Sequence, residues 1–135
     1  MPFAVQFVSP EKVLFEAEAE MVVCRTTDGE IAFLPGHVPF VGALGIAKVR
    51  VLVADSNEVV AAVHGGFVEV ANDRVTVLSD VAELSDQVDA LRASRAKDRA
   101  TDKLRSDPED AEAIDALARA ELRLEVAGAT ASASR

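Results

Sequence analysis

The valines of this 135-residue chain are confined almost entirely to its first 84 residues. Residues 1–84 contain 18 of the 20 valines, all six phenylalanines and six of the seven glycines, whereas residues 85–135 contain 13 alanines. Branched and aromatic side chains favour strands because they fit a pleated, half-buried surface. Alanine favours helix because it loses no side-chain entropy there. The chain therefore predicts a β domain over residues 1–84 and a helical unit over residues 85–135.

Apolar and polar residues alternate over short segments of the first part, and turn residues separate these segments. Phe3, Val5 and Phe7 occupy alternate positions of the first segment, which is the period of a strand with one buried face. Pairs such as Asp28-Gly29 and Asn72-Asp73 favour tight turns. About eight to ten short strands at this spacing predict an antiparallel β-sandwich or flattened barrel.

Gly65 and Gly66 follow a strand-like segment that runs from Val59 to His64. Glycine has no Cβ, so within a sheet it permits a bulge or the close approach of another backbone. We therefore expect the strand to end or bulge at this pair, at a bend where two backbones approach. The pair is not followed closely by a basic residue, as a phosphate-binding loop would require.

The alanine-rich part contains two segments with helical periodicity. The first is expected to begin at a capping side chain, Ser85 or Asp86, and to run to about Leu104. The second is expected to begin at Asp107-Pro108, with the proline in the first helical position, and to run to about Val126. The predicted fold class is therefore α+β, an antiparallel β-sandwich followed by an antiparallel helical hairpin.

The seam of this hairpin is poor in large side chains. It therefore buries little apolar area, at about 25 cal/mol per Å², and an isolated hairpin of about 40 residues with so thin a core is marginal. Gly128 is expected to end the second helix. The hairpin needs the β domain or a partner to hold it, and weak docking of this kind suits a movable arm.

The net charge of −9 restricts the classes of partner. Residues 1–84 contain 5 basic and 12 acidic side chains, and residues 85–135 contain 9 basic and 11 acidic ones. An acidic protein repels phosphate backbones and anionic lipids, so no nucleic acid is expected as a partner. Cys24 is the only cysteine, which excludes an intrachain disulfide and suits a reducing cytoplasm. No signal peptide and no transmembrane segment are expected from the sequence.

Two sequence blocks identify a family. The first is TTDGEIAFLPGHVP at residues 26–39, and the second is GGFVEV at residues 65–70. Together, in this order and ahead of an alanine-rich charged tail, they resemble the epsilon subunit of the bacterial F-type ATP synthase. The resemblance extends from about Val8 to Val126.

This resemblance implies a rotor and regulatory protein without an active site of its own. The β-sandwich would join the gamma subunit to the c-ring, at the cytoplasmic face of the bacterial cell membrane, as a peripheral protein. The helical arm would inhibit ATP hydrolysis when it extends toward the alpha and beta subunits. By the same resemblance the c-ring contact comprises Asp28, Gly29 and Glu30, and the gamma contact comprises Pro35, Gly36 and His37.

The segment VDALRA at residues 88–93 resembles the I/L-D-x-x-R-A segment through which some bacterial epsilon subunits bind ATP. Asp89 and Arg92 lie three residues apart and therefore on one helix face, and arginine can bind a phosphate with two hydrogen bonds. The resemblance implies a regulatory ATP site, and no required cofactor. Its candidate residues are Glu83, Val88, Asp89, Arg92, Ala93, Arg99, Arg119 and Arg123. The alternative interpretation of these residues is an ordinary salt-bridged helix surface.

Two other classes of protein remain open. The first is a small cupin-like metal-dependent β-barrel enzyme, because the Pro-Gly-His stretch is faintly similar to a cupin motif. However, no His-x-His precedes it, and His37, His64 and Cys24 lack the spacing of a ligand set, so no metal site is predicted. The second is a free nucleotide-sensing module outside any rotary complex. Bound metal would favour the first class, and a failure to associate with a rotary motor would favour the second.

Overall fold

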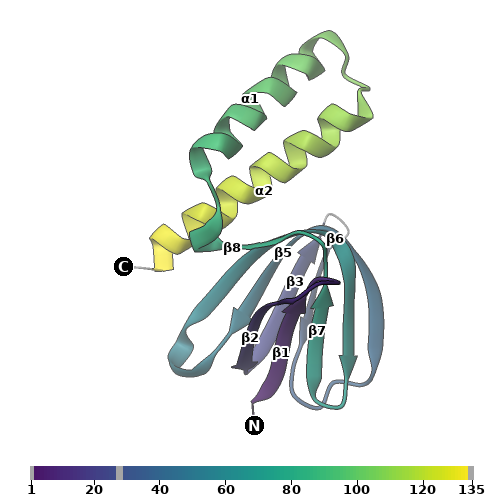
Figure 1. The fold of residues 1–135 in the computed structure, drawn as a ribbon, viewed down its shortest axis with the longest axis vertical. Helices are drawn as coiled ribbons and strands as arrows, with labels where there is room; N and C mark the ends of the chain where they lie inside the picture. The colour runs from purple at the N-terminus through teal and green to yellow at the C-terminus, as the bar shows by residue number, and fades with distance from the viewer. Residues whose placement is uncertain (1, 27–28, 134–135) are drawn as a thin grey trace.

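The computed structural model describes residues 2–26 and 29–133, and within them a curved β-sheet is followed by two helices (Figure 1). The sheet has eight strands in the described part of the chain, with the order β2-β1-β7-β6-β5-β3-β4, and β8 pairs with β6. The strands are β1 (Phe3–Val8), β2 (Val13–Ala19), β3 (Met21–Thr26), β4 (Gly29–Phe33), β5 (Phe40–Leu52), β6 (Glu58–Ala71), β7 (Arg74–Leu78) and β8 (Ala82–Leu84). Helices α1 (Ala90–Ser106) and α2 (Ala111–Ala133) follow. The predicted fold class is confirmed.

The core lies on the inner face of the curved sheet, where the predicted alternation is observed. Phe3, Val5 and Phe7 of β1 are buried while the residues between them are partly exposed. Val49 and Val51 of β5 are fully buried in the same cluster. One pairing differs from expectation, because β1 and β7 are parallel. Alternation determines which face of a strand is buried, but it does not determine the direction of a strand whose partner is distant in the chain.

The paired glycines bend the longest strand without ending it. Strand β6 continues through them, and its register with β5 passes from Ile46 opposite His64 to Leu44 opposite Gly66. Gly65 and Gly66 have φ values of 86° and 130°, and a Cβ at Gly66 would lie 2.0 Å from the Leu78 carbonyl oxygen. The expected close approach of two backbones is confirmed. Of the two expected alternatives, an end or a bulge, the strand does not end, because glycine accommodates the bend within a continuous strand.

Both helices begin later than predicted. Helix α1 is capped by Asp89, whose Oδ1 accepts from the Arg92 N–H at 3.0 Å, and residues Ser85–Gln87 form a separate 3-10 turn. At the start of α2, Oδ1 of Asp110 accepts from the Ala113 N–H at 3.0 Å. The predicted caps Ser85, Asp86 and Asp107 are therefore wrong. Each predicted start had a second aspartate three or four residues further along, and that later aspartate caps the helix.

Helix α2 also continues beyond the predicted end at Val126. Its backbone remains helical through Gly128 to Ala133. Gly128 has no left-handed φ, so it does not adopt the conformation with which glycine ends a helix. Alanines on both sides of Gly128 favour continued helix. None of the described helices is both long and apolar enough to cross a membrane.

The hairpin packs against the sheet through a small second apolar cluster. Val60 and Ala62 of β6 meet Leu122 and Val126 of α2 there, and Ile46 and Val88 contribute at its edge. Arg25 forms an ion pair with Glu125, and Lys48 lies 3.8 Å from the same carboxylate. Between the helices the buried residues are alanines, namely Ala93, Ala100, Ala113 and Ala120. Figure 1 shows the two helices side by side, projecting from one end of the sheet.

Candidate functional site

A hollow of about 340 Å³ lies where β8 meets the two helices. Six of the predicted nucleotide-site residues line it, namely Glu83, Asp89, Arg92, Ala93, Arg99 and Arg123. They come from β8, from α1 with its capping residue, and from α2, and Arg123 of α2 is far along the chain from the others. The pairing of β8 with β6, which sets Glu83 opposite Ala62, fixes the carboxylate at the base of the hairpin.

Two of the three arginines that line this hollow lie along one face of α1. Arg92 and Arg99 are seven residues apart, so about 10 Å separates them along the helix axis. Neither makes an ion pair within the described part of the chain. The Asp89 side chain is held by its helix cap. Two arginines that face a hollow with free guanidinium groups are suited to bind an anion such as a phosphate chain.

Two predicted residues lie outside this hollow. Val88 packs against the apolar cluster between α2 and β6. Arg119 pairs with Glu112 at 3.1 Å and lines an adjoining hollow of about 300 Å³ together with Arg99, Lys103 and Arg123. The sequence interpretation missed Gln87, Ala96 and Lys103. The helical spacing of Arg92, Ala96, Arg99 and Lys103 could have identified the last two.

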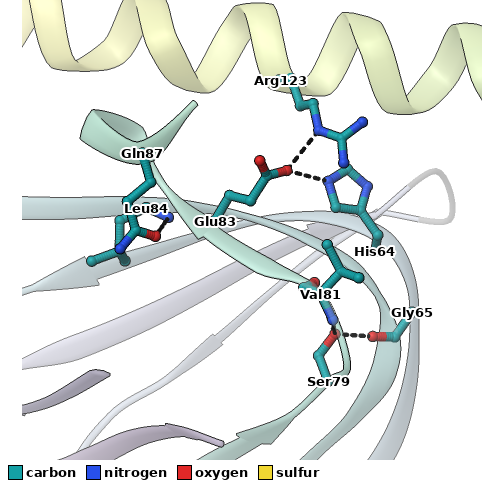
Figure 2. Close-up of polar contacts among 8 residues, drawn as sticks. All are labelled: His64, Gly65, Ser79, Val81, Glu83, Leu84, Gln87 and Arg123. Carbon is teal, nitrogen blue, oxygen red and sulfur yellow. Dashed lines mark hydrogen bonds and ion pairs between the residues drawn. The ribbon is translucent and has the colours of Figure 1, made fainter. Parts of the chain in front are cut away.

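A partly buried polar network ties the sheet to α2 beneath this hollow (Figure 2). Glu83 Oε1 accepts from Arg123 Nε at 2.6 Å and from His64 Nε2 at 3.3 Å. Only 6% of the His64 side chain is exposed, and its Nδ1 is buried without a hydrogen-bond partner. Burial and the Arg123 charge lower the pKa of His64, against an opposing contribution from Glu83. His64 is therefore neutral and donates through Nε2, since a carboxylate can only accept.

A second small network anchors the connection from β7 to β8. The Ser79 hydroxyl oxygen lies 2.6 Å from the Gly65 carbonyl and 2.9 Å from the Val81 carbonyl, to either of which it can donate. The same oxygen accepts from the Val81 N–H at 3.2 Å. Ser79 is itself buried. The bend of β6 and the path of the chain toward Glu83 are thus held by one hydroxyl group (Figure 2).

The predicted contact residues lie in and beside β4, and the Glu30 end of this strand is near the hairpin, because Arg25 opposite Glu30 pairs with Glu125 of α2. Asp28 lies outside the described residues, Gly29 begins β4, and Glu30 is exposed opposite Arg25. Pro35, Gly36 and His37 form a turn in which the His37 N–H donates to the Leu34 carbonyl at 3.0 Å. The His37 ring packs edge-on against Phe33, with ring centroids 5.1 Å apart.

An exposed apolar row, which the sequence interpretation missed, crosses five strands. Strand pairing aligns Ala43 of β5, Phe67 of β6, Leu78 of β7, Val8 of β1 and Val13 of β2. Phe67 is 53% exposed, Val13 47% and Leu78 42%. Contiguous exposed apolar surface marks an interaction site more often than scattered apolar residues do. Only the register shows this row, because its members are far apart in the sequence.

The remaining chemistry-bearing side chains are separate from one another. Cys24 is buried in β3, and burial raises the pKa of its thiol to about 12, so it is a thiol rather than a thiolate at neutral pH. His37 lies in the loop before β5 and His64 beneath α2. Across residues 2–26 and 29–133, no three His, Cys, Asp or Glu side chains form a group that could hold a metal ion.

Comparison with known proteins covers both parts of this architecture. A family described as the ATP synthase delta/epsilon chain, beta-sandwich domain, matches residues 2–85. The ATP synthase epsilon chain of Bacillus velezensis is 45% identical over 127 residues, covering 92% of this chain and 96% of the relative. That of Streptomyces avermitilis is 43% identical over 96 residues, covering 71% of this chain and 77% of the relative.

One solved structure shares the fold at low sequence identity. A chain in the cryo-EM structure of the Euglena gracilis mitochondrial ATP synthase, OSCP/F1/c-ring, aligns with a TM-score of 0.73. It is 20% identical, and the alignment covers 94% of this chain and 79% of that chain. This likeness concerns the fold alone.

Proposed function

The chain belongs to the family of ATP synthase epsilon chains, and from this premise we propose that it is a non-catalytic subunit of the central stalk of an F-type ATP synthase. The observation that carries this proposal is the 45% identity over 127 residues, which includes the hairpin as well as the sheet. In this role it transmits rotation of the c-ring to the gamma subunit. Its place is the cytoplasmic face of the bacterial membrane, as a peripheral subunit.

The gamma subunit is the partner we propose for the exposed apolar row and the turn before it. Pro35, Gly36 and His37 precede β5, and the exposed Val38 and Val41 continue from this turn toward the row. The gamma subunit has to rotate together with the sheet, which requires a broad and rigid contact. The five paired strands provide such a contact. The acidic tip, Asp28, Gly29 and Glu30, is proposed to contact the polar loops of the c-ring.

A pull-down from the membrane fraction tests this role. Tagged protein is expected to recover gamma, alpha, beta and c subunits. Phe67→Asp is expected to lose them, because it places a charge in the centre of the apolar row. Leu91→Asp is the matched control, since Leu91 is also exposed (62%) but lies on α1. Recovery of no rotary subunit by the unmodified chain would refute the proposed function, and equal recovery by both variants would refute the proposed gamma contact.

We further propose that the hollow between β8 and the hairpin binds regulatory ATP. Arg92 and Arg99 provide free guanidinium groups for phosphates, and Glu83 and Asp89 provide carboxylates that can accept from the ribose or the adenine amino group. The site exists only while the hairpin is docked, because Glu83 belongs to the sheet and Arg123 to α2. Nucleotide would therefore stabilise the docked arm, and release of the arm toward the alpha and beta subunits would inhibit ATP hydrolysis.

The energy available to nucleotide limits this regulation. A switch from 1:99 to 99:1 needs about 5.5 kcal/mol of differential binding. A ligand at 100 times its dissociation constant supplies about 2.7 kcal/mol to the state it prefers. ATP thus biases the position of the arm, and contacts within the motor supply the rest.

Isothermal titration of the isolated protein with ATP tests the site. Arg92→Ala is expected to weaken binding at least tenfold, as loss of one charged hydrogen-bond donor does. Arg95→Ala is the matched control, because Arg95 lies on the same helix but does not line the hollow. Absence of binding heat up to millimolar ATP would refute the nucleotide site while leaving the stalk role intact.

A further inference from the structure

His64 is the one described side chain that is deeply buried, can change its charge near neutral pH, and has a buried nitrogen without a partner. It sits on β6 opposite Ile46, on the outer face of the sheet that α2 covers. Its Nε2 donates a hydrogen bond to the Glu83 carboxylate, which also accepts one from Arg123. Through Glu83, His64 therefore contacts both the floor of the proposed nucleotide hollow and the junction between sheet and hairpin (Figure 2).

We propose that His64 is a positioning residue that orients Glu83 toward Arg123 while neutral, and that its protonation releases the hairpin and weakens nucleotide binding. The nucleotide part rests on the proposed function, whereas the hairpin part depends only on the contacts described here. Neutral His64 donates its single N–H to Glu83 and leaves Nδ1 as a lone pair. Protonation turns Nδ1 into a buried donor without an acceptor, which is costly.

The charges around His64 determine the direction of the effect. Glu83 of β8 favours the imidazolium, whereas Arg123 and Arg119 of α2 oppose it, and its β5 neighbour Ile46 carries no charge. When the hairpin leaves, both arginines and the apolar cover leave with it, while Glu83 remains beside His64. The released form therefore binds a proton more readily than the docked form.

The pH window follows from this difference. The docked form holds the pKa of His64 below its usual value, so docking is fully supported above the ordinary histidine value of about 6.5 and is lost as the pH falls below it. One linked proton changes the docking constant by at most tenfold per pH unit. Between pH 7.5 and 5.5, with a released-state value of about 6.5, the largest change is about tenfold.

Thiol labelling measures this release in the full-length chain. Val60→Cys places a thiol beneath α2, where it reacts only when the hairpin leaves, and Cys24 in the same molecule reports unfolding of the sheet. Labelling rates are divided by the rate of free cysteine at each pH. The opening constant is expected to rise toward tenfold between pH 7.5 and 5.5, while Cys24 stays unlabelled. In His64→Gln, whose amide can still donate to Glu83 but cannot titrate, it is expected to change less than twofold.

Two further measurements separate the proposed role of His64 in hairpin docking from its proposed role in nucleotide binding. Arg123→Gln removes one opposing charge and is expected to reduce the pH response. The dissociation constant for ATP, measured at the same pH values, is expected to rise by the factor by which the docked fraction falls in the unmodified chain, and to stay level in His64→Gln. An equal pH response with and without His64 would overturn the inference. Absence of ATP binding at every pH would remove the nucleotide role while the labelling result still decides the hairpin role.

Discussion

Truncation of Leu122 is expected to release the hairpin without unfolding the sheet. Leu122 is 8% exposed and packs with Val126 against Val60 and Ala62. Replacement by alanine removes three carbon groups, at about 0.8 kcal/mol each. A fully enclosed cavity would add a further cost, but Leu122 also borders an open hollow of about 580 Å³ that water can enter. We therefore expect a loss of about 2 to 2.5 kcal/mol, which is about 30- to 70-fold in the docking constant.

Limited trypsin digestion measures this change. The hairpin carries eight of the described lysines and arginines, so its cleavage reports release, and the rate follows the open population when reclosing is fast. Ile114→Ala is the matched control, because Ile114 lies on α2 and borders the same hollow but is 49% exposed. It is expected to change cleavage less than threefold. Equal acceleration by both variants, or loss of the sheet before the hairpin is cut, would refute this reasoning.

Three other substitutions or treatments give distinct outcomes. Gly66→Ala is expected to lower stability by more than about 3 kcal/mol in thermal unfolding, because its Cβ would lie 2.0 Å from the Leu78 carbonyl oxygen at a φ of 130°. Gly45→Ala, across the same bend and with nothing within 4 Å of its Cβ, is the control and should cost less than about 1 kcal/mol. The Cys24 thiol, with its pKa raised to about 12, is expected not to react with Ellman's reagent at pH 8 until the protein is unfolded. Truncation after Ser85 should raise ATP hydrolysis by the assembled enzyme if the arm inhibits, and unchanged hydrolysis would contradict that role.

The β domain was predictable because one property, alternation, determines which face of each strand is buried. Phe3, Val5 and Phe7 show this directly. Alternation carries no information about strand direction, so the parallel pairing of β1 and β7 was missed. The helix starts were missed for a related reason. Asp86 and Asp89 have the same capping chemistry, and the 3-10 turn that selects Asp89 depends on the hydrogen bond from the Leu84 N–H to the Gln87 side chain.

The proposed nucleotide-site residues on α1 came from the resemblance of residues 88–93 to an ATP-binding segment, and helical spacing added only that Asp89 and Arg92 lie on one face. The contact of His64 with Glu83 beneath α2 was not predictable from the sequence. Its place beneath α2 depends on where β8 pairs with β6 and on how the hairpin folds back. The apolar row was hidden in the same way, since the alignment of Phe67 with Leu78 is a property of register. Both features arise from tertiary structure rather than from local pattern.

Glu83 links these features into one thermodynamic system. Glu83 belongs to β8, whose backbone pairs with β6 of the sheet, and its carboxylate accepts hydrogen bonds from His64 and Arg123. The same side chain lines the proposed nucleotide hollow. A ligand that needs this arrangement binds the docked form only, so binding and docking must strengthen one another by the same factor. ATP at 100 times its dissociation constant contributes about 2.7 kcal/mol to docking, which matches the loss of about 2 to 2.5 kcal/mol expected for Leu122→Ala.

Saturating ATP should therefore return tryptic cleavage of the Leu122→Ala hairpin to nearly the rate of the unmodified chain. The same ATP should leave the hairpin of Leu122→Ala combined with Arg92→Ala exposed, because the second substitution removes a phosphate-binding group without touching the apolar cluster. Rescue of both variants would show that nucleotide acts elsewhere. Rescue of neither, with binding heat still measured, would show that the site forms independently of docking, which the position of Glu83 between sheet and α2 contradicts.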